Sequence, residues 1–227
     1  MNEKLWVISL GGSRIVPNEV DENFLVRFKK LIDNNPKHKF VVITGGGTTA
    51  RKYISALKRL HKNTKDQSMA GIAVTRLHAK FMARFFGRTA NEEIPFNMKK
   101  IPKLLIHNKV VFAGALKYKK NNTSDGTAAG IAAFLKCPFI NLTNVKGLYT
   151  SNPKTHKSAK FIPKITWKKF NDIVKEMTYS AGQHFVLDQS ASKIIMKNKI
   201  PTYIVGSLKD IDSILRNKKF VGTLISG

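Results

Sequence analysis

The residues of this chain with the clearest chemical potential are three glycine-rich turns, each of which directly follows a short apolar stretch. They are Gly11–Gly12, Gly45–Gly47 and Gly114. Because glycine has no side chain, the backbone N–H groups of such a turn can approach phosphate oxygens closely, and a following helix adds the positive end of its dipole. A single glycine after a strand is more often only a turn, so it is the repetition that indicates phosphate binding.

Two charged side chains lie close to such turns or helix starts. Arg51 comes one helical turn after the triple glycine, where contact with phosphate is favoured over an ion pair on the helix surface. Asp125 precedes a stretch of small residues typical of a helix, so it is a candidate both for capping that helix and for catalysis. Neither GxxxxGKS/T nor GxGxxG is present, which disfavours the P-loop and dinucleotide-binding classes.

Alternating strands and helices must position these residues. Strands are predicted at 4–10, 39–44, 109–114, the start of 138–149, 201–206 and 222–226, and helices at 21–35, 47–60, 70–87, 127–136, 166–178, 188–199 and directly after 207. This alternation predicts an α/β fold with a mostly parallel sheet covered on both faces. Ligands of such sheets bind beyond the carboxyl ends of the strands, which is where the glycine turns fall.

The composition fits one folded unit without a membrane anchor. A chain of 227 residues can bury the core of a single large α/β domain, and no apolar run approaches the roughly 18–20 residues of a membrane span. The lone Cys137 excludes an internal disulfide, which fits a cytoplasmic protein. The formal net charge of +26 is carried mostly by lysines spread along the chain, which favours a solvated surface with some non-specific affinity for polyanions over a dedicated nucleic-acid site.

Seven segments of the sequence resemble the amino acid kinase superfamily and, within it, the archaeal type of uridylate (UMP) kinase. They are ISLGGS (8–13), GGGTTARKY (45–53), GIAVTRLHA (71–79), TSDGTAAGIAAFL (123–135), TNVKGLYTSNP (143–153), VLDQSASKII (186–195) and GTLI (222–225). The resemblance implies a three-layer αβα sandwich with a central, mostly parallel sheet. It also implies transfer of the ATP γ-phosphate to UMP in pyrimidine nucleotide biosynthesis, dependence on Mg²⁺, and a hexamer.

The resemblance further implies one domain over 1–227, with an acceptor-binding lobe of about 1–135 and an ATP-binding lobe of about 136–227. Asp125 would organise the reacting groups and Lys193 would neutralise the transferring phosphoryl group. The residues that would bind ATP are Ser9, Leu10, Gly11, Gly12, Ser13, Gly47, Arg51, Thr143, Tyr149 and Asn152. Those that would bind UMP are Gly46, Ser68, Gly114 and Thr123. No carboxylate cluster occurs in these segments, so Mg²⁺ is expected to be held mainly by nucleotide phosphates and water.

Several positions depart from the family pattern. Ser68 stands where the family usually has an aspartate that binds the UMP ribose, with Asp66 as a candidate substitute two residues earlier. Lys146 and Asn152 replace two usual acids, and the acceptor loop over 115–122 is long and lysine-rich. These departures leave two alternatives open. One is a kinase of the same fold for another small phosphorylated acceptor, and the other is a non-catalytic nucleotide- or RNA-binding derivative.

Overall fold

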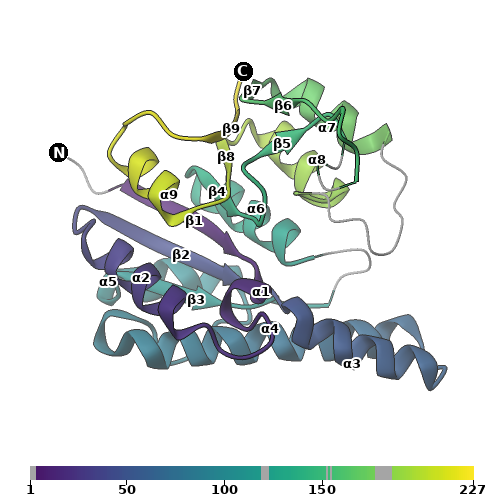
Figure 1. Cartoon of the computed structure of the whole chain (residues 1–227). Coiled ribbons are helices and arrows are strands. Elements are labelled where there is room, and N and C mark those ends of the chain that lie inside the picture. Colours follow the sequence, from purple (N-terminus) through teal and green to yellow (C-terminus); the bar gives the residue numbers. More distant parts are fainter. Residues whose placement is uncertain (1–3, 119–122, 152, 154, 177–185) are drawn as a thin grey trace.

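A seven-stranded sheet forms the centre of the computed structural model, which describes residues 4–118, 123–151, 153, 155–176 and 186–227. The strand order is β3-β2-β1-β4-β8-β9-β7 (Figure 1). The five strands from β3 to β8 are parallel, and β8 and β9 are antiparallel. The strands are β1 (Lys4–Leu10), β2 (His38–Thr44), β3 (Val110–Ala113), β4 (Phe139–Leu142), β7 (Lys164–Ile165), β8 (Thr202–Val205) and β9 (Gly222–Ile225). A separate antiparallel pair is formed by β5 (Leu148–Tyr149) and β6 (Phe161–Ile162).

Helices cover both faces of the sheet, as the sequence predicts. One face packs against α1 (Gly12–Ile15), α2 (Glu22–Asp33), α4 (Thr64–Phe86) and α9 (Leu208–Leu215). The other packs against α5 (Ile101–His107), α6 (Ser124–Leu135), α7 (Trp167–Glu176) and α8 (Gln189–Asn198). Short 3₁₀ turns occupy Gly87–Thr89 and Met98–Lys100. Because successive strand residues face opposite sides, β1 sends Trp6 and Ile8 into the first core and Val7 into the second. The three-layer α/β architecture is confirmed.

Two helices begin earlier than the apolar pattern of the sequence predicts. Helix α4 starts at Thr64 rather than at 70, because the Asn63 side chain accepts a hydrogen bond from the Asp66 N–H at 2.9 Å and caps a polar first turn. Helix α6 starts at Ser124 rather than at 127, and its N-cap is Thr123. Asp125 therefore lies inside the first turn of α6 and is not its cap. Polar first turns carry no apolar periodicity, so the sequence pattern misses them.

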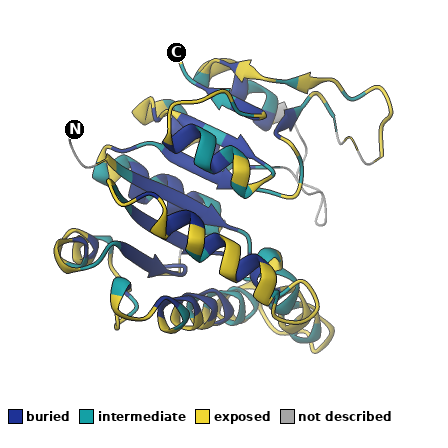
Figure 2. Cartoon of the chain, turned by 60° about the vertical axis from the view of Figure 1, so that its left-hand side comes forward, coloured by how far each residue is buried: buried dark blue, intermediate teal, exposed yellow. Residues whose placement is uncertain are grey.

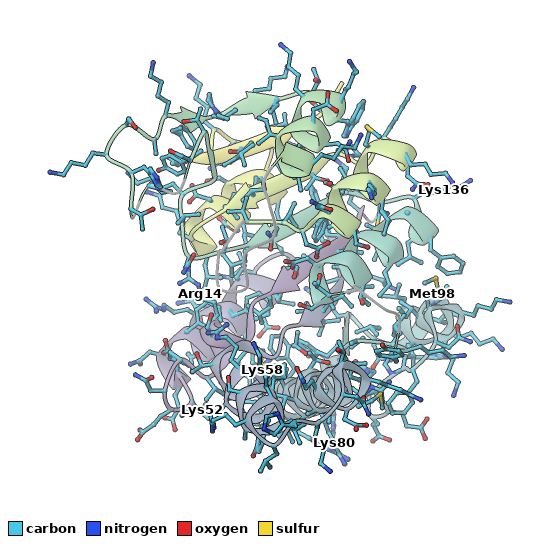
Figure 3. All side chains as sticks on the ribbon, turned by 90° about the vertical axis from the view of Figure 1, so that its right-hand side faces the viewer. Arg14, Lys52, Lys58, Lys80, Met98 and Lys136 are labelled. Carbon is cyan, nitrogen blue, oxygen red and sulfur yellow. The ribbon has the colours of Figure 1, made fainter. Side chains whose placement is uncertain are left out.

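Helix α3 (Gly47–Arg59) lies outside these layers and packs along α4. It extends beyond the sheet at the lower right of Figure 1. Ala50 is its one buried residue, whereas the strands at the centre of the sheet are coloured mostly as buried in Figure 2. Figure 3 shows Lys52 and Lys58 on this helix. Elsewhere in the same view, nitrogen-tipped side chains project from both the upper and the lower part of the molecule.

We call α3 and α4 together the helical arm. The arm also carries exposed apolar side chains, among them Tyr53 and Leu77.

Candidate active site

The first two glycine turns pack directly against each other at the carboxyl ends of β1 and β2. The Gly45 N–H donates to the Leu10 carbonyl at 2.8 Å and so extends the strand pairing into the turns. A Cβ atom on Gly12 would lie 2.3 Å from the Gly45 carbonyl oxygen, and one on Gly47 would lie 2.4 Å from the Gly12 carbonyl carbon. Gly47 also has φ +57°, a conformation that disfavours side chains. The turns are glycine-rich because they touch, and together they present one backbone surface beside the N-terminus of α3.

Ser9 and Asp125 meet beside these turns, although they are far apart in the sequence. Ser9 is near the end of β1, and its Oγ donates to Asp125 Oδ1 at 2.6 Å. Burial raises the pKa of Asp125 to about 6, the negative charge of Asp188 adds to that rise, and the Ser9 hydrogen bond opposes it. Asp125 is thus a partly buried carboxylate at a helix N-terminus, where it can accept a hydrogen bond or a proton near neutral pH.

A second contact joins the N-termini of α6 and α8. Thr123 caps α6 by accepting a hydrogen bond from the Gly126 N–H at 3.1 Å, and Asp188 caps α8 by accepting one from the Ala191 N–H at 2.9 Å. The Thr123 hydroxyl also donates to Asp188 Oδ2. Two positively polarised helix ends are therefore fixed next to Asp125, which is a favourable environment for anions. The sequence does not indicate the bond between Thr123 and Asp188.

Arg14 is a residue of this region that the sequence does not single out. Its Nη2 donates to the Thr143 carbonyl at 2.6 Å and to the Gly206 carbonyl at 2.8 Å, so it joins the turn after β1 to the ends of β4 and β8. Burial lowers the pKa of the guanidinium, and the charge of Asp21 partly offsets this. In the sequence, the only sign of a role for Arg14 is its position directly after Gly12–Ser13. The two carbonyls that it binds lie far along the chain, so the sequence does not reveal these contacts.

The other predicted ATP-binding residues are more loosely connected. Arg51 is exposed on α3, and its Nη2 donates to Thr48 Oγ1 at 3.1 Å. Tyr149 packs on Phe161, with ring centroids 5.4 Å apart. The side chain of Leu10 is fully buried in the core, so only its backbone is available to a ligand. Gly11 is partly exposed, and Ser13 is exposed.

The predicted catalytic lysine remains apart from this network. Lys193 is exposed on α8, more than one turn beyond Asp188, and takes no part in the hydrogen bonds that join Ser9, Asp125, Thr123 and Asp188. Asn152 lies outside the described residues.

Of the predicted UMP-binding residues, Gly46 and Gly114 follow β2 and β3, Ser68 lies within α4, and Thr123 caps α6. Gly46 belongs to the backbone surface formed by the glycine turns. Gly114 packs so closely on α4 that a Cβ atom on it would lie 2.6 Å from the backbone nitrogen of Arg76. Ser68 lies within α4 and donates to the Thr64 carbonyl at 2.8 Å. The carboxylate of Asp66 accepts from Asn63 Nδ2 at 2.8 Å, in the exposed first turn of α4. Ser68 is thus a helix residue, and Asp66 is engaged in capping.

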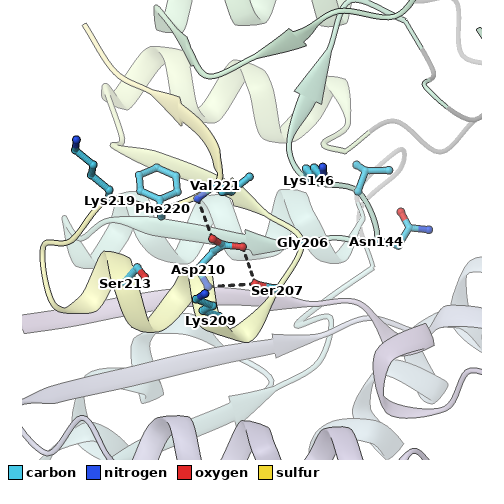
Figure 4. Close-up of a pocket in the computed structure, with 11 residues that line it drawn as sticks. Asn144, Lys146, Gly206, Ser207, Lys209, Asp210, Ser213, Lys219, Phe220 and Val221 are labelled. Carbon is cyan, nitrogen blue, oxygen red and sulfur yellow. Dashed lines mark hydrogen bonds between the residues drawn. The ribbon is translucent and has the colours of Figure 1, made fainter. Parts of the chain in front are cut away.

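A groove with a volume of about 600 Å³ lies apart from these residues, between α9 and the segment after β4 (Figure 4). Lys146, Lys209 and Lys219 contribute to its lining. Its carboxylate, Asp210, accepts hydrogen bonds from the Ser207 hydroxyl at 2.6 Å and from the Val221 N–H at 2.8 Å. Among the described residues, none of those predicted for the site lines this groove.

Within the described part of the chain, no three or more His, Cys, Asp or Glu side chains gather as metal ligands would. The helices in the same residues include none that is both long and apolar enough to cross a membrane.

Known proteins share this fold and much of this sequence. Residues 4–206 match the model of the amino acid kinase family. A uridylate kinase from Thermococcus onnurineus (strain NA1) is 33% identical over 210 residues, which is 92% of each chain. One from Methanococcus aeolicus is 32% identical, over 97% of this chain and 98% of the relative. The crystal structure of a uridylate kinase from Archaeoglobus fulgidus superposes with a TM-score of 0.85 at 32% identity, covering 97% of this chain and 99% of that one. The chain therefore belongs to the amino acid kinase family.

Proposed function

We propose that this protein is an ATP-dependent UMP kinase, which transfers the γ-phosphate of ATP to UMP and yields UDP and ADP in pyrimidine nucleotide biosynthesis. The observation that carries the proposal is the joined pair of glycine turns with Ser9 and Asp125 beside it, in a chain that matches uridylate kinases over nearly its whole length. Phosphoryl transfer demands mainly that two phosphates be placed in line and that the developing charge be neutralised. Backbone N–H groups and helix N-termini are suited to that task.

We propose that the two nucleotides bind side by side at the carboxyl ends of neighbouring strands. UMP would lie at the ends of β2 and β3, near Gly46 and Gly114, in the lobe of about residues 1–135. ATP would lie at the ends of β1 and β4, near Gly12 and Thr143, against the lobe of about residues 136–227. The support for this arrangement is that all these strands end at the same edge of one continuous sheet.

In this arrangement Asp125 orients the reacting groups between the two nucleotides. Its carboxylate is held by Ser9, and the N-terminus of α6 stabilises its negative charge. The exposed cations Arg51 and Lys193 would turn toward the phosphates when nucleotides are present, because neither is held in the interior. The backbone surface of Gly12 and Gly47 would bind phosphate oxygens and keep water from the transferring group.

The carboxylates of the site can supply few oxygen ligands for Mg²⁺. Both carboxylate oxygens of Asp188 accept hydrogen bonds. Oδ1 of Asp125 accepts one from Ser9, so Asp125 Oδ2 is the carboxylate oxygen of these two residues that can coordinate the ion. Mg²⁺ commonly takes one or two carboxylates together with phosphates and water. We therefore propose that Asp125 and the nucleotide phosphates hold the ion, which would neutralise phosphate charge. EDTA should abolish turnover, and added MgCl₂ should restore it.

The test of the proposed function is the release of ADP from ATP and Mg²⁺ in the presence of UMP, CMP, dUMP, AMP or GMP. We expect turnover to be highest with UMP. Turnover with a different acceptor alone would reassign the substrate, in which case Ser68 and the lysine-rich loop are marks of that change. ATP binding without turnover on any acceptor would favour the non-catalytic alternative.

We further propose that the protein is a cytoplasmic homo-oligomer, a hexamer by resemblance, which assembles through the helical arm. The support is the set of exposed apolar side chains on or next to the arm, namely Tyr53, Leu60, Met69, Leu77 and Phe81. Several exposed apolar side chains on two packed helices indicate a contact surface more strongly than isolated ones do.

A charge introduced on this surface should weaken the assembly. We expect Leu60→Glu, at a residue 67% exposed in the single chain, to reduce the mass measured by light scattering while the isolated fold stays intact. Val26→Glu is the matched control, because Val26 is exposed to a similar degree on α2, outside the arm. An unchanged mass for Leu60→Glu, or the same loss for both variants, would contradict assembly through the arm.

A further inference from the structure

One helix, α4, contacts both turns that the proposed function assigns to the acceptor. At the end of β2, the Thr44 hydroxyl donates to the Thr75 carbonyl at 2.8 Å. One turn of α4 further, the buried ring of His78 forms a hydrogen bond between Nδ1 and the Gly45 carbonyl at 2.8 Å. The position of the glycine turn after β2 is thus defined by the side chains and backbone of α4.

The same helix holds the segment after β3, which we call the acceptor segment and define as Gly114–Leu116. The Ala115 N–H donates to Thr75 Oγ1 at 2.9 Å. Arg76 donates from Nε to the Ala115 carbonyl at 3.0 Å and from Nη2 to the Leu116 carbonyl. Gly114 has no side chain that would keep this segment away from the α4 backbone. Three successive residues are therefore fixed against one helical turn.

The guanidinium of Arg76 is well suited to this task. It is planar, remains charged, and presents its N–H donors in a fixed fork, so that two neighbouring carbonyls are held at a set distance and angle. The ring of Phe96 covers the guanidinium, with 4.4 Å between the Arg76 Cζ and the ring centroid. Ala115 and Leu116 are buried, and their carbonyls would otherwise need other partners. Lysine has a single charged nitrogen and cannot reproduce this geometry.

We infer that Arg76 is a positioning residue for the acceptor: it sets the path of the acceptor segment and aligns it with the glycine turn after β2. This inference rests on the proposed function and adds a residue to which that proposal gives no role. Arg76 acts through the backbone that it holds, since its fork is directed at two carbonyl groups. Losing it should weaken binding of the acceptor much more than binding of ATP.

The experiment compares Arg76→Met, Arg76→Lys and Arg84→Met in the full chain. Methionine keeps the apolar stem of the side chain while removing the donors. Arg84→Met is the matched control, because Arg84 is an exposed arginine on the same helix. We expect Arg76→Met to raise the KM for UMP about 10- to 100-fold, because the acceptor segment loses both of its hydrogen bonds to the guanidinium and is no longer aligned for UMP. The KM for ATP should change by less than about twofold. Arg76→Lys should fall between the two other variants.

Hydrogen exchange of the substrate-free protein supplies a readout that does not depend on the identity of the acceptor. Amides of the acceptor segment should exchange faster in Arg76→Met and remain unchanged in Arg84→Met. Faster exchange with an unchanged KM for UMP would reduce Arg76 to a structural role, and unchanged exchange would remove its contact with the segment; either result overturns the inference. A wild-type protein that is inactive on UMP would overturn the proposed function instead, and the exchange experiment would still test the positioning.

Discussion

Replacing Asp125 with asparagine should lower turnover about 100- to 1,000-fold, the range seen when one preorganised electrostatic group is removed from an active site. Asparagine keeps the size of the side chain and an oxygen that can accept the Ser9 hydrogen bond at the position where Oδ1 now lies. The loss is therefore one of charge rather than of shape. The measurement is kcat for ADP release, with the fold checked by circular dichroism.

The same substitution should change how the stability of the nucleotide-free protein depends on pH. The pKa of Asp125 is about 6 in the folded chain, against 3.8 for an ordinary aspartate, so the folded state binds more protons than the unfolded state between about pH 4 and 6. The wild type should therefore lose stability as the pH rises through this window, by up to about 3 kcal/mol in free energy of unfolding. Asp125→Asn lacks this titration, so its stability relative to the wild type should increase from about pH 4 to 7.

The matched control for Asp125 is Glu22→Gln. Glu22 is likewise an acid in the first turn of a helix, but it is exposed on α2. The Glu22→Gln variant should keep normal turnover. This result would separate the general effect of losing a first-turn carboxylate from the particular role of Asp125. Near-normal turnover in Asp125→Asn would remove the catalytic assignment. A stability difference that stays constant with pH, measured by urea unfolding, would show that the pKa of Asp125 is not raised in the folded protein.

Replacing Arg14 with methionine should destabilise the fold and weaken ATP binding together. Arg14 fixes the carbonyls of Thr143 and Gly206, and without it both lose a charged donor in a partly buried place. Hydrogen bonds to charged groups are each worth about 1.5–3 kcal/mol and Arg14 makes two, so we expect the free energy of unfolding to fall by about 3–6 kcal/mol. Because Thr143 belongs to the proposed ATP site, the KM for ATP should rise more than the KM for UMP.

Arg27→Met is the control for Arg14. Arg27 is exposed on α2 and donates to the Asn23 carbonyl one turn earlier on the same helix at 3.2 Å. Its loss should leave stability within about 0.5 kcal/mol of the wild type, as for most surface substitutions. If Arg14→Met raises both KM values equally, or leaves the KM for ATP unchanged, then Arg14 does not shape the ATP site in particular.

The sequence predicts the elements of this protein better than it predicts the contacts among them. Strands β1 and β2 and the turns after them are visible because apolar runs and glycines are local signals. The bond between Ser9 and Asp125 joins residues that are 116 positions apart, and no periodicity reports such a pairing. Arg14 and Arg76 are further examples. Each binds carbonyl groups, and since every residue has a carbonyl, the type of the partner residue gives no clue.

The contact between the first two glycine turns also links the ligand to the completion of folding. Gly12 and Gly47 meet only after β1 and β2 have paired in the register that brings Leu10 opposite Thr44. A partly folded chain with these strands separated would lack the backbone surface altogether. Nucleotides would bind the fully paired sheet and not its precursors, so by mass action they should stabilise the whole domain against unfolding. The thermal midpoint of the protein should then follow the nucleotide concentration, and the cell's nucleotide supply would influence how much of this chain persists in folded form.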